Sequence, residues 1–382
     1  MATGLSLILF ILLLFLLSLG IWVAPALITL GYILLEFFTP APVGSLLAST
    51  LWDASWNWAL TALPLFIWMG EILFRTRLSS EMFKGLAPML SNLPGGLLHV
   101  NVVGCGIMAA VAGSSAVTCA TIGRMSIPEL KKRNYDETLS IGSLAGSGTL
   151  GLLIPPSIML IVYAAASGTS IVRLYAGALL PGFMLAGLYL IYVVGRSIAQ
   201  PEMAPRPSKD EVPDIPLLRV IWMLLTSFLP LAALILAVLG SILGGLATPS
   251  EAASVGAMGG LLLAVAYRAL TWQRLRESVY LTMRTTAMVC WLFVGSYTFS
   301  SVFSYLGGEQ IISEFVEHLN LSPVTFLLLA QLIIFLLGWP LEWSEIIIIF
   351  VPIFLPLLPQ FGICLLYTSP SPRDVEESRM PA

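Results

Sequence analysis

Long apolar stretches follow one another along nearly the whole chain, separated by short turns that contain polar residues, glycine or proline. A helix needs about 20 mostly apolar residues to cross a bilayer. By this criterion the pattern predicts spanning helices at 4–19, 24–38, 57–74, 138–167, 172–194, 220–243, 251–267 and 285–305. The stretch 138–167 differs from the others because glycines and prolines break it in the middle. The predicted fold is an all-α, polytopic integral membrane protein.

Two further apolar stretches, 95–130 and 323–358, are interrupted near their middles by small or polar residues. If 95–130 turns at Gly113, Ser114 and Ser115, each limb is short of spanning length or barely reaches it. This length favours a re-entrant hairpin, which enters and leaves the membrane on the same side. The second interrupted stretch predicts a hairpin of the same kind.

The distribution of basic residues agrees with a hairpin at 95–130. Fifteen of the 18 lysines and arginines fall into four groups: Arg75, Arg77 and Lys84; Arg124, Lys131, Lys132 and Arg133; Arg196, Arg206, Lys209 and Arg219; and Arg268, Arg274, Arg276 and Arg284. If 95–130 enters and leaves on one side, all four groups share one face, which the positive-inside rule assigns to the cytoplasm. The hairpin 323–358 then opens to the outside.

The composition excludes a soluble globular protein. The 382 residues are 58% hydrophobic and 10% charged, with a mean hydropathy of +0.93. Soluble domains are about 25% charged. A soluble fold of this size could not bury so much apolar surface.

A proline-rich polar segment, 196–219, divides the chain into two membrane halves. Residues 1–195 form the first half, with the cytoplasm-facing hairpin 95–130. Residues 220–363 form the second half, with the outward-facing hairpin 323–358. The shared plan and opposite orientation indicate an inverted repeat, and in secondary transporters the interrupted segments of such repeats indicate the binding site.

The composition changes abruptly at about Cys364, where membrane-like sequence gives way to serine, proline and charged residues. We interpret residues 364–382 as a non-native end, because the first half follows its hairpin with the broken helix 138–167 and the second half offers no counterpart. The alternative is a disordered tail that belongs to the protein.

The break within 138–167 reads GSGTLGLLIPPS, from Gly146 to Ser157. Its first six residues fit G-x-G-x-x-G, but neither a preceding strand nor a following carboxylate supports nucleotide binding. We expect exposed carbonyls between Thr149 and Ile154, and Pro155 and Pro156 at the start of a second half-helix. These carbonyls, together with hydroxyls of the tip 113–115, could hold sodium. The alternative is a proline kink with tight glycine packing.

The tip of the second hairpin carries Glu342 and Glu345, and carboxylates at membrane depth are candidates for function. Alternatively, they lie near the surface and pair with the backbone. Other polar positions have structural interpretations. Glu71 and Arg75 are spaced as an ion pair on one helix face, and Thr248, Pro249 and Glu251 form a capping box. The four cysteines, Cys105, Cys119, Cys290 and Cys364, have no metal or redox spacing and are interpreted as packing residues.

Several of these segments together resemble the large membrane subunit of tripartite ATP-independent periplasmic (TRAP) transporters, and the resemblance covers roughly 1–363. The segments are LTALPLFIWMGEILF (60–74), LPGGLLHVNV (93–102), AGSSAVTCATIG (112–123), GTLGLLIPPSIMLIVYA (148–164), LATPSEAASVGAMGGLLLA (246–264) and LLGWPLEWSEIIIIFVPIFLP (336–356). The acidic second tip is most similar to the branch that carries dicarboxylates and related organic acids.

The resemblance implies an elevator-type secondary transporter in the bacterial inner membrane, surrounded by lipid, with sodium as coupling ion and no cofactor. It implies two protein partners, a small four-helix membrane subunit and a periplasmic binding protein that delivers a carboxylate solute. By resemblance, Ser114 and carbonyls near Gly151, Ile154 and Pro156 form a sodium site. Ala112 stands where many members have serine, and a second proline-pair segment is missing.

Two other functions are alternatives. A related anion transporter or exchanger that works alone fits the same pattern of hairpins. An intramembrane hydrolase does not, because no serine in the apolar segments has a histidine or lysine partner at suitable spacing. The chain is therefore not expected to be an enzyme, and nothing in it predicts nucleic-acid binding.

Overall fold

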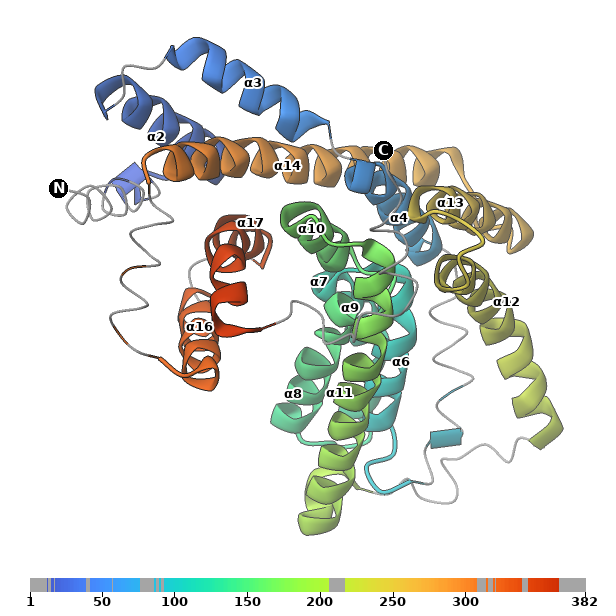
Figure 1. The fold of residues 1–382 in the computed structure, drawn as a ribbon. Helices are drawn as coiled ribbons and strands as arrows, with labels where there is room; N and C mark the ends of the chain where they lie inside the picture. Colours follow the sequence, from blue (N-terminus) through green and yellow to red (C-terminus); the bar gives the residue numbers. More distant parts are fainter. Residues whose placement is uncertain are drawn as a thin grey trace. The chain divides into compact units, whose positions relative to one another are not determined.

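The computed structural model describes residues 12, 15–16, 18–38, 42–56, 58–75, 86, 89–90, 93–205, 217–307, 314, 319, 321–338 and 343–363. All regular structure in these residues is helical, which confirms the predicted all-α fold (Figure 1). The helices are α2 Val23–Phe38, α3 Val43–Ser55, α4 Trp58–Phe74, α6 Leu98–Ala112, α7 Ser115–Lys132, α8 Glu137–Gly148, α9 Leu150–Leu153, α10 Ile158–Ser167, α11 Ile171–Ala199, α12 Leu217–Leu243, α13 Pro249–Ala266, α14 Trp272–Tyr305, α16 Pro323–Leu337 and α17 Trp343–Phe354. Two 3₁₀ turns cover Pro201–Met203 and Leu355–Phe361.

The observed helices depart from the predicted ones at two places. Helix α3 was missed, because its sequence is short and mixes small, polar and apolar residues. Helix α14 begins at Trp272, well before the predicted 285, because its first turns carry arginine and glutamate. These residues fail an apolar criterion although they favour helix. The predicted tail 364–382 and most of the predicted span 4–19 lie outside the described residues.

Within the described chain, three helices are long and apolar enough to cross a membrane: Ile171–Ala199, Pro249–Ala266 and Trp272–Tyr305. Up to five spans result if each of two bent helix pairs counts as one. One of these pairs is the predicted broken segment, in which Glu137–Leu153 and Ile158–Ser167 meet at 45°. The predicted break is therefore confirmed at the predicted place.

The chain folds into two compact units that interleave along the sequence. Unit 1 contains residues 1–57, 166–168 and 288–382, and unit 2 contains residues 58–165 and 169–287. This division reflects packing and does not test the predicted sequence halves at 1–195 and 220–363, which remain a prediction. Helix α11 continues to Ala199 and α12 begins at Leu217, so the predicted linker 196–219 is helical at both ends.

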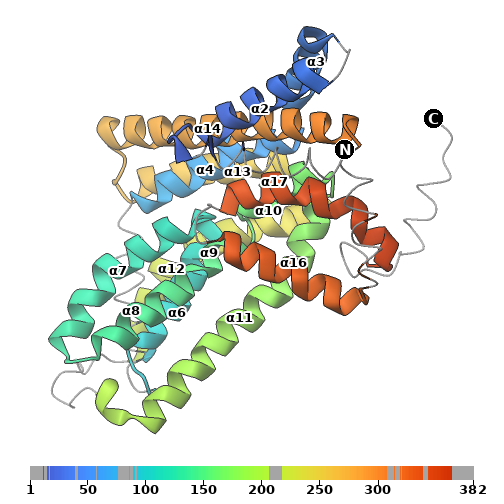
Figure 2. The same ribbon diagram turned by 90° about the vertical axis from the view of Figure 1, so that its left-hand side faces the viewer.

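Unit 2 is built around a bundle in which α6, α7 and α8 run side by side and contact one another (Figures 1 and 2). Helices α9 and α11 complete this bundle. Its core is apolar and includes the fully buried Leu98, Cys105, Ile122 and Leu150. Cys105 is thus a packing residue, as expected. Helix α4 packs lengthwise on α13 and also contacts α6 of the bundle.

The contact between α4 and α13 depends on small residues. A Cβ atom added to Gly256 would lie 2.7 Å from the sulfur of Met69, and one added to Gly260 would lie 3.5 Å from Cγ of Leu73. Unit 1 repeats this arrangement, because a Cβ atom on Gly295 of α14 would lie 2.8 Å from Cα of Ala24 on α2. Helices in a bilayer gain little from burying apolar surface and associate through such close packing instead.

The predicted capping box at the start of α13 is confirmed. The backbone N–H of Thr248 donates to the Glu251 carboxylate at 2.8 Å, and the backbone N–H of Glu251 donates to Oγ1 of Thr248 at 3.4 Å. Pro249 occupies the first helical position, where a missing N–H costs nothing. The box therefore satisfies backbone groups at the entry of a helix that packs on α4.

Replacing Thr248 with alanine is expected to lower the stability of the protein by about 1 kcal/mol, the usual cost of losing an N-cap. Thermal unfolding in detergent micelles measures this effect. Ser254→Ala is the matched control, because Ser254 is an exposed residue of the same helix whose hydroxyl donates to the Ser250 carbonyl one turn earlier. Equal unfolding temperatures for the two variants would contradict the assigned role of the cap.

Candidate functional site

The first predicted hairpin is a pair of antiparallel helices, α6 and α7, joined by a turn of two residues. Helix α6 ends at Ala112, and Gly113 reverses the chain in the left-handed conformation, with φ +57°. Ser114 is extended and stands at the N-cap position of α7, where its carbonyl accepts the N–H of Thr118 at 3.1 Å. Glycine suits the turn because other residues adopt a positive φ only at a cost.

The break follows from two adjacent prolines. In a continuous helix the carbonyls of Gly151 and Leu152 would accept hydrogen bonds from residues 155 and 156, but Pro155 and Pro156 have no N–H. The Ser157 hydroxyl donates to the Leu152 carbonyl in place of the missing donor. Gly151 receives no such replacement from the prolines, so its carbonyl loses its helical donor.

The hairpin tip packs directly against this break (Figure 1). A Cβ atom added to Gly113 would lie 2.9 Å from the backbone nitrogen of Ile158, the first residue of α10. A Cβ atom added to Gly151 would lie 2.9 Å from the carbonyl oxygen of Ser114 and 3.0 Å from Oγ1 of Thr118. Two glycines thus let two irregular backbone segments touch, as the sequence interpretation requires.

The structure brings some of the predicted site residues together and separates others. Ser114 is partly exposed at the tip, and Gly151, Ile154 and Pro156 are buried in the break. Ser115 lies beside α8, with its carbonyl oxygen 3.5 Å from the Cβ position of Gly148.

Thr149 is exposed, and its side chain is turned away from the tip. Its hydroxyl donates to the Gly146 carbonyl at 2.6 Å and lies 3.1 Å from the Tyr189 hydroxyl on α11. The Thr149 hydroxyl is therefore not part of the contact between tip and break.

Of the two acidic residues predicted at the second hairpin tip, the structure describes only Glu345. Glu345 is partly buried in the first turn of α17, while Glu342 and the rest of the tip lie outside the described residues. The helices on either side, α16 and α17, stand at the predicted positions of the two limbs. The role of the two carboxylates stays a prediction.

Thr118 belongs to the contact and was missed by the sequence interpretation. It is fully buried, and its Oγ1 has no hydrogen-bond partner within the described part of the chain. The sequence carried one usable signal, because Thr118 follows Ser114 by four residues and so lies on the same side of α7.

The contact between tip and break is built from uncharged groups, namely hydroxyl and carbonyl oxygens together with the backbone N–H and side chain of Ile158. Nowhere in the described residues do three or more histidine, cysteine, aspartate or glutamate side chains gather in a way that could hold a metal ion. Neutral oxygens suit a hard monovalent cation better than a transition metal.

Unit 1 contains a cavity that the sequence interpretation also missed. Its volume is about 240 Å³. The residues that line it are Ala166, Phe293, Ser296, Tyr297, Ser300, Ile348 and Leu355. Ser296 and Ser300 are four residues apart on α14, so the sequence predicts that they share one helix face. The sequence does not predict the cavity.

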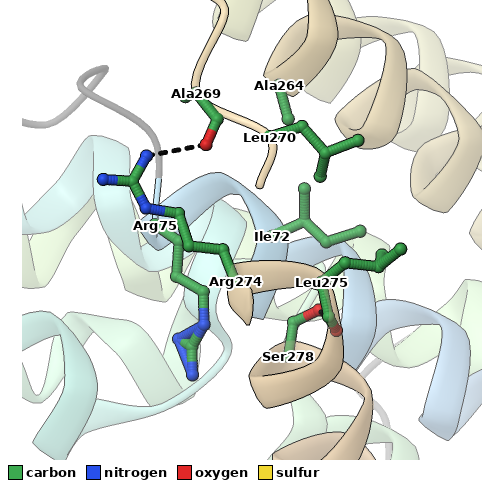
Figure 3. A pocket seen from close by; sticks show the side chains of 8 residues that line it. All are labelled: Ile72, Arg75, Ala264, Ala269, Leu270, Arg274, Leu275 and Ser278. Atoms are coloured by element: carbon green, nitrogen blue, oxygen red, sulfur yellow. Dashed lines mark hydrogen bonds between the residues drawn. The ribbon is translucent and has the colours of Figure 1, made fainter. Parts of the chain in front are cut away.

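A second, much smaller pocket in unit 2 is structural. Figure 3 shows its lining between α4, α13 and the start of α14, where the Arg274 guanidinium donates to the Ala269 carbonyl at 2.6 Å. Arg75 lines this pocket and forms the predicted pair with Glu71, at a nitrogen-to-oxygen distance of 3.2 Å. Arg75 also lies 4.0 Å from Glu277. The arginine side chains of this pocket thus connect the ends of neighbouring helices. The volume of the pocket is about 10 Å³, enough for one water molecule.

The all-helical fold and its apolar helices define a membrane protein, and the comparisons place it among transporters. Residues 10–368 match the family model described as tripartite ATP-independent periplasmic transporter, DctM component. The chain belongs to this family. It is not an enzyme but a permease, and it is a multi-pass protein of the inner membrane.

Three relatives illustrate the family. The C4-dicarboxylate TRAP transporter large permease protein of Pseudomonas aeruginosa is 32% identical over 87% of this chain and 76% of its own length. The 2,3-diketo-L-gulonate large permease of Escherichia coli is 27% identical, over 92% and 80% respectively. The sialic acid large permease of Vibrio cholerae is 26% identical, over 80% and 70%.

Among solved structures, the Alcanivorax borkumensis YdaH transporter is similar, with a TM-score of 0.54 and 16% identity. The match covers 82% of this chain and 72% of that one. At this identity the likeness concerns the fold alone, which is that of a membrane transporter. The predicted elevator-type architecture is consistent with it.

Replacing Gly151 with alanine is expected to destabilise the protein by about 1–3 kcal/mol, because the new methyl group would overlap the Ser114 carbonyl. Gly142→Ala on α8 is the matched control, since a Cβ atom there meets nothing within 4 Å. The control is expected to be neutral or to raise stability by up to about 1 kcal/mol. The unfolding temperatures of both variants test this expectation. Equal unfolding temperatures would show that the tip does not pack tightly against the break.

Proposed function

We propose that this chain is the large membrane subunit of a sodium-coupled, binding-protein-dependent TRAP transporter that imports a carboxylate-bearing organic solute. The observation that carries the proposal is the contact of the hairpin tip with the proline break, in a chain that belongs to the DctM family. Such interrupted elements hold substrates and coupling ions in secondary transporters.

The solute class is inferred from the names of the relatives. C4-dicarboxylates, 2,3-diketo-L-gulonate and sialic acid differ in size and in hydroxyl content, but each is a carboxylic acid. We propose a dicarboxylate-like solute for this chain, because two large permeases named for C4-dicarboxylate, those of P. aeruginosa and Rhodobacter capsulatus, match it at 32% and 29% identity.

The residues present fit a sodium ion. The Ser114 hydroxyl and the carbonyls of Gly151, Ile154 and Pro156 are neutral oxygen donors, and the prolines deprive the Gly151 carbonyl of its helical hydrogen bond. A divalent cation normally requires carboxylate ligands, which this set lacks. When bound, sodium would supply the driving force for uptake through its gradient across the membrane.

The proposed partners follow from the family description, which names one component of a tripartite system. A small four-helix membrane subunit would complete the membrane part, and a periplasmic binding protein would deliver the solute. The two hairpins would be re-entrant and would belong to the moving part of an elevator.

Uptake by reconstituted vesicles tests the proposal. With the small subunit and the binding protein present, a radiolabelled C4-dicarboxylate is expected to accumulate on an inward sodium gradient without ATP. Equal uptake with potassium in place of sodium would refute sodium coupling. Undiminished uptake in the absence of both partner proteins would favour a transporter that works alone.

Ser114→Ala is expected to weaken sodium dependence more than solute recognition. Loss of one hydroxyl ligand costs about 1 kcal/mol, so the sodium concentration for half-maximal uptake should rise about fivefold while the apparent solute affinity at saturating sodium stays near that of the unaltered protein. Ser126→Ala is the control, because Ser126 is a buried serine about three turns further along α7. An unchanged sodium curve would make Ser114 a packing residue.

A further inference from the structure

Thr118 places a buried hydroxyl at the contact between tip and break, against Gly151. Its exposed fraction is 0%, and Oγ1 finds no hydrogen-bond partner among the described residues. A helical threonine commonly donates to the carbonyl four residues earlier. Here that carbonyl belongs to Ser114, which accepts the backbone N–H of Thr118 at 3.1 Å but receives no hydrogen bond from Oγ1.

An unpartnered buried hydroxyl is costly. Burying such a group without a hydrogen bond costs about 1–3 kcal/mol. Valine has nearly the same shape as threonine and would avoid the cost, so packing alone does not account for threonine at position 118. A ligand that accepts a lone pair from Oγ1 would offset it.

The surroundings of Oγ1 indicate what that ligand is. Oγ1 of Thr118 and the carbonyl oxygen of Ser114 lie 3.0 Å and 2.9 Å from the same point, the Cβ position of Gly151. A carbonyl has two lone pairs, so that of Ser114 can accept a second partner besides the Thr118 N–H. Two oxygens from the tip therefore converge on Gly151, whose own carbonyl lacks its helical donor because residue 155 is proline.

The helix dipoles do not oppose a cation at this place. Helices α6 and α9 end here, and their C-terminal ends attract positive charge, whereas α7 and α10 begin here and their N-terminal ends repel it. With two ends of each sign, the dipoles largely offset one another, and the oxygen ligands decide what binds.

We propose that the Thr118 hydroxyl is a direct ligand of the coupling cation, in addition to Ser114 and the carbonyls of the break. The inference rests on the proposed sodium coupling and extends its ligand set to the first turn of α7. The ligand is a small, hard monovalent cation, because every donor is a neutral oxygen.

Stabilisation of the full-length purified protein by sodium tests the proposal without requiring transport. The melting temperature is measured in detergent over a series of sodium concentrations, with choline keeping the ionic strength constant. Thr118→Val is expected to raise the sodium concentration for half-maximal stabilisation about tenfold. Thr118→Ser keeps the hydroxyl and is expected to stay within about twofold of the unaltered protein.

Ser126→Ala is the matched control, because Ser126 is also fully buried on α7 and its hydroxyl also has no partner among the described residues. Its sodium curve is expected to match that of the unaltered protein. An equal shift for Thr118→Val and Ser126→Ala would overturn the proposal, and so would an unshifted curve for Thr118→Val, which is the result expected if Oγ1 meets only a water molecule.

Two further outcomes are informative. If Thr118→Val does not fold, Thr118→Cys replaces it, because a thiol of similar size is a poor ligand for a hard cation. That variant is expected to shift the sodium curve in the same direction, and an unshifted curve would overturn the proposal. If the unaltered protein gains no more stability from sodium than from choline, sodium coupling itself fails, and the role of Thr118 fails with it.

Discussion

The backbone contact between the hairpin tip and the proline break is the constraint around which unit 2 is organised. In a bilayer, each N–H and C=O group must find a partner inside the protein, so an interrupted helix persists only where it is packed in protein or lines a polar site. Here the hairpin tip and the proline break pack against each other, and glycines at positions 113 and 151 let the two backbones approach closely. The Ser157 hydroxyl satisfies one carbonyl that the prolines leave open. The remaining unpaired oxygens make the junction polar in an otherwise apolar bundle.

The same use of small residues recurs where helices pack along their length. Gly148 of α8 faces Cys119 of α7, with a Cβ-to-Cβ distance of 3.0 Å for an added methyl group, and Gly256 and Gly260 face α4. Each contact brings helix axes close enough for many weak van der Waals interactions to add up. Larger side chains at these positions would separate the helices that pack there.

Charged and uncharged polar groups occupy different parts of the helices. Ion pairs such as Glu71–Arg75 and Lys132–Glu129 stand near helix ends, where they contribute modestly to stability. The junction of tip and break carries hydroxyls and carbonyls instead. Neutral oxygens bind a cation more weakly than carboxylates do, because no fixed negative charge balances the charge of the cation.

The sequence by itself determined the features that depend on local chemistry. Apolar length predicted most of the helices, because the hydrocarbon core demands it; Pro155 and Pro156 predicted the break; and Thr248 with Glu251 predicted a helix start. Ser114, Gly151, Ile154 and Pro156 were placed near one another through the resemblance to a family. Only the tertiary structure decided that Thr149 turns toward Tyr189, that Thr118 faces Gly151, and that α14 encloses a cavity with α17. The reason is that a helical sequence specifies which residues share a face, whereas the partner of that face depends on how distant segments pack.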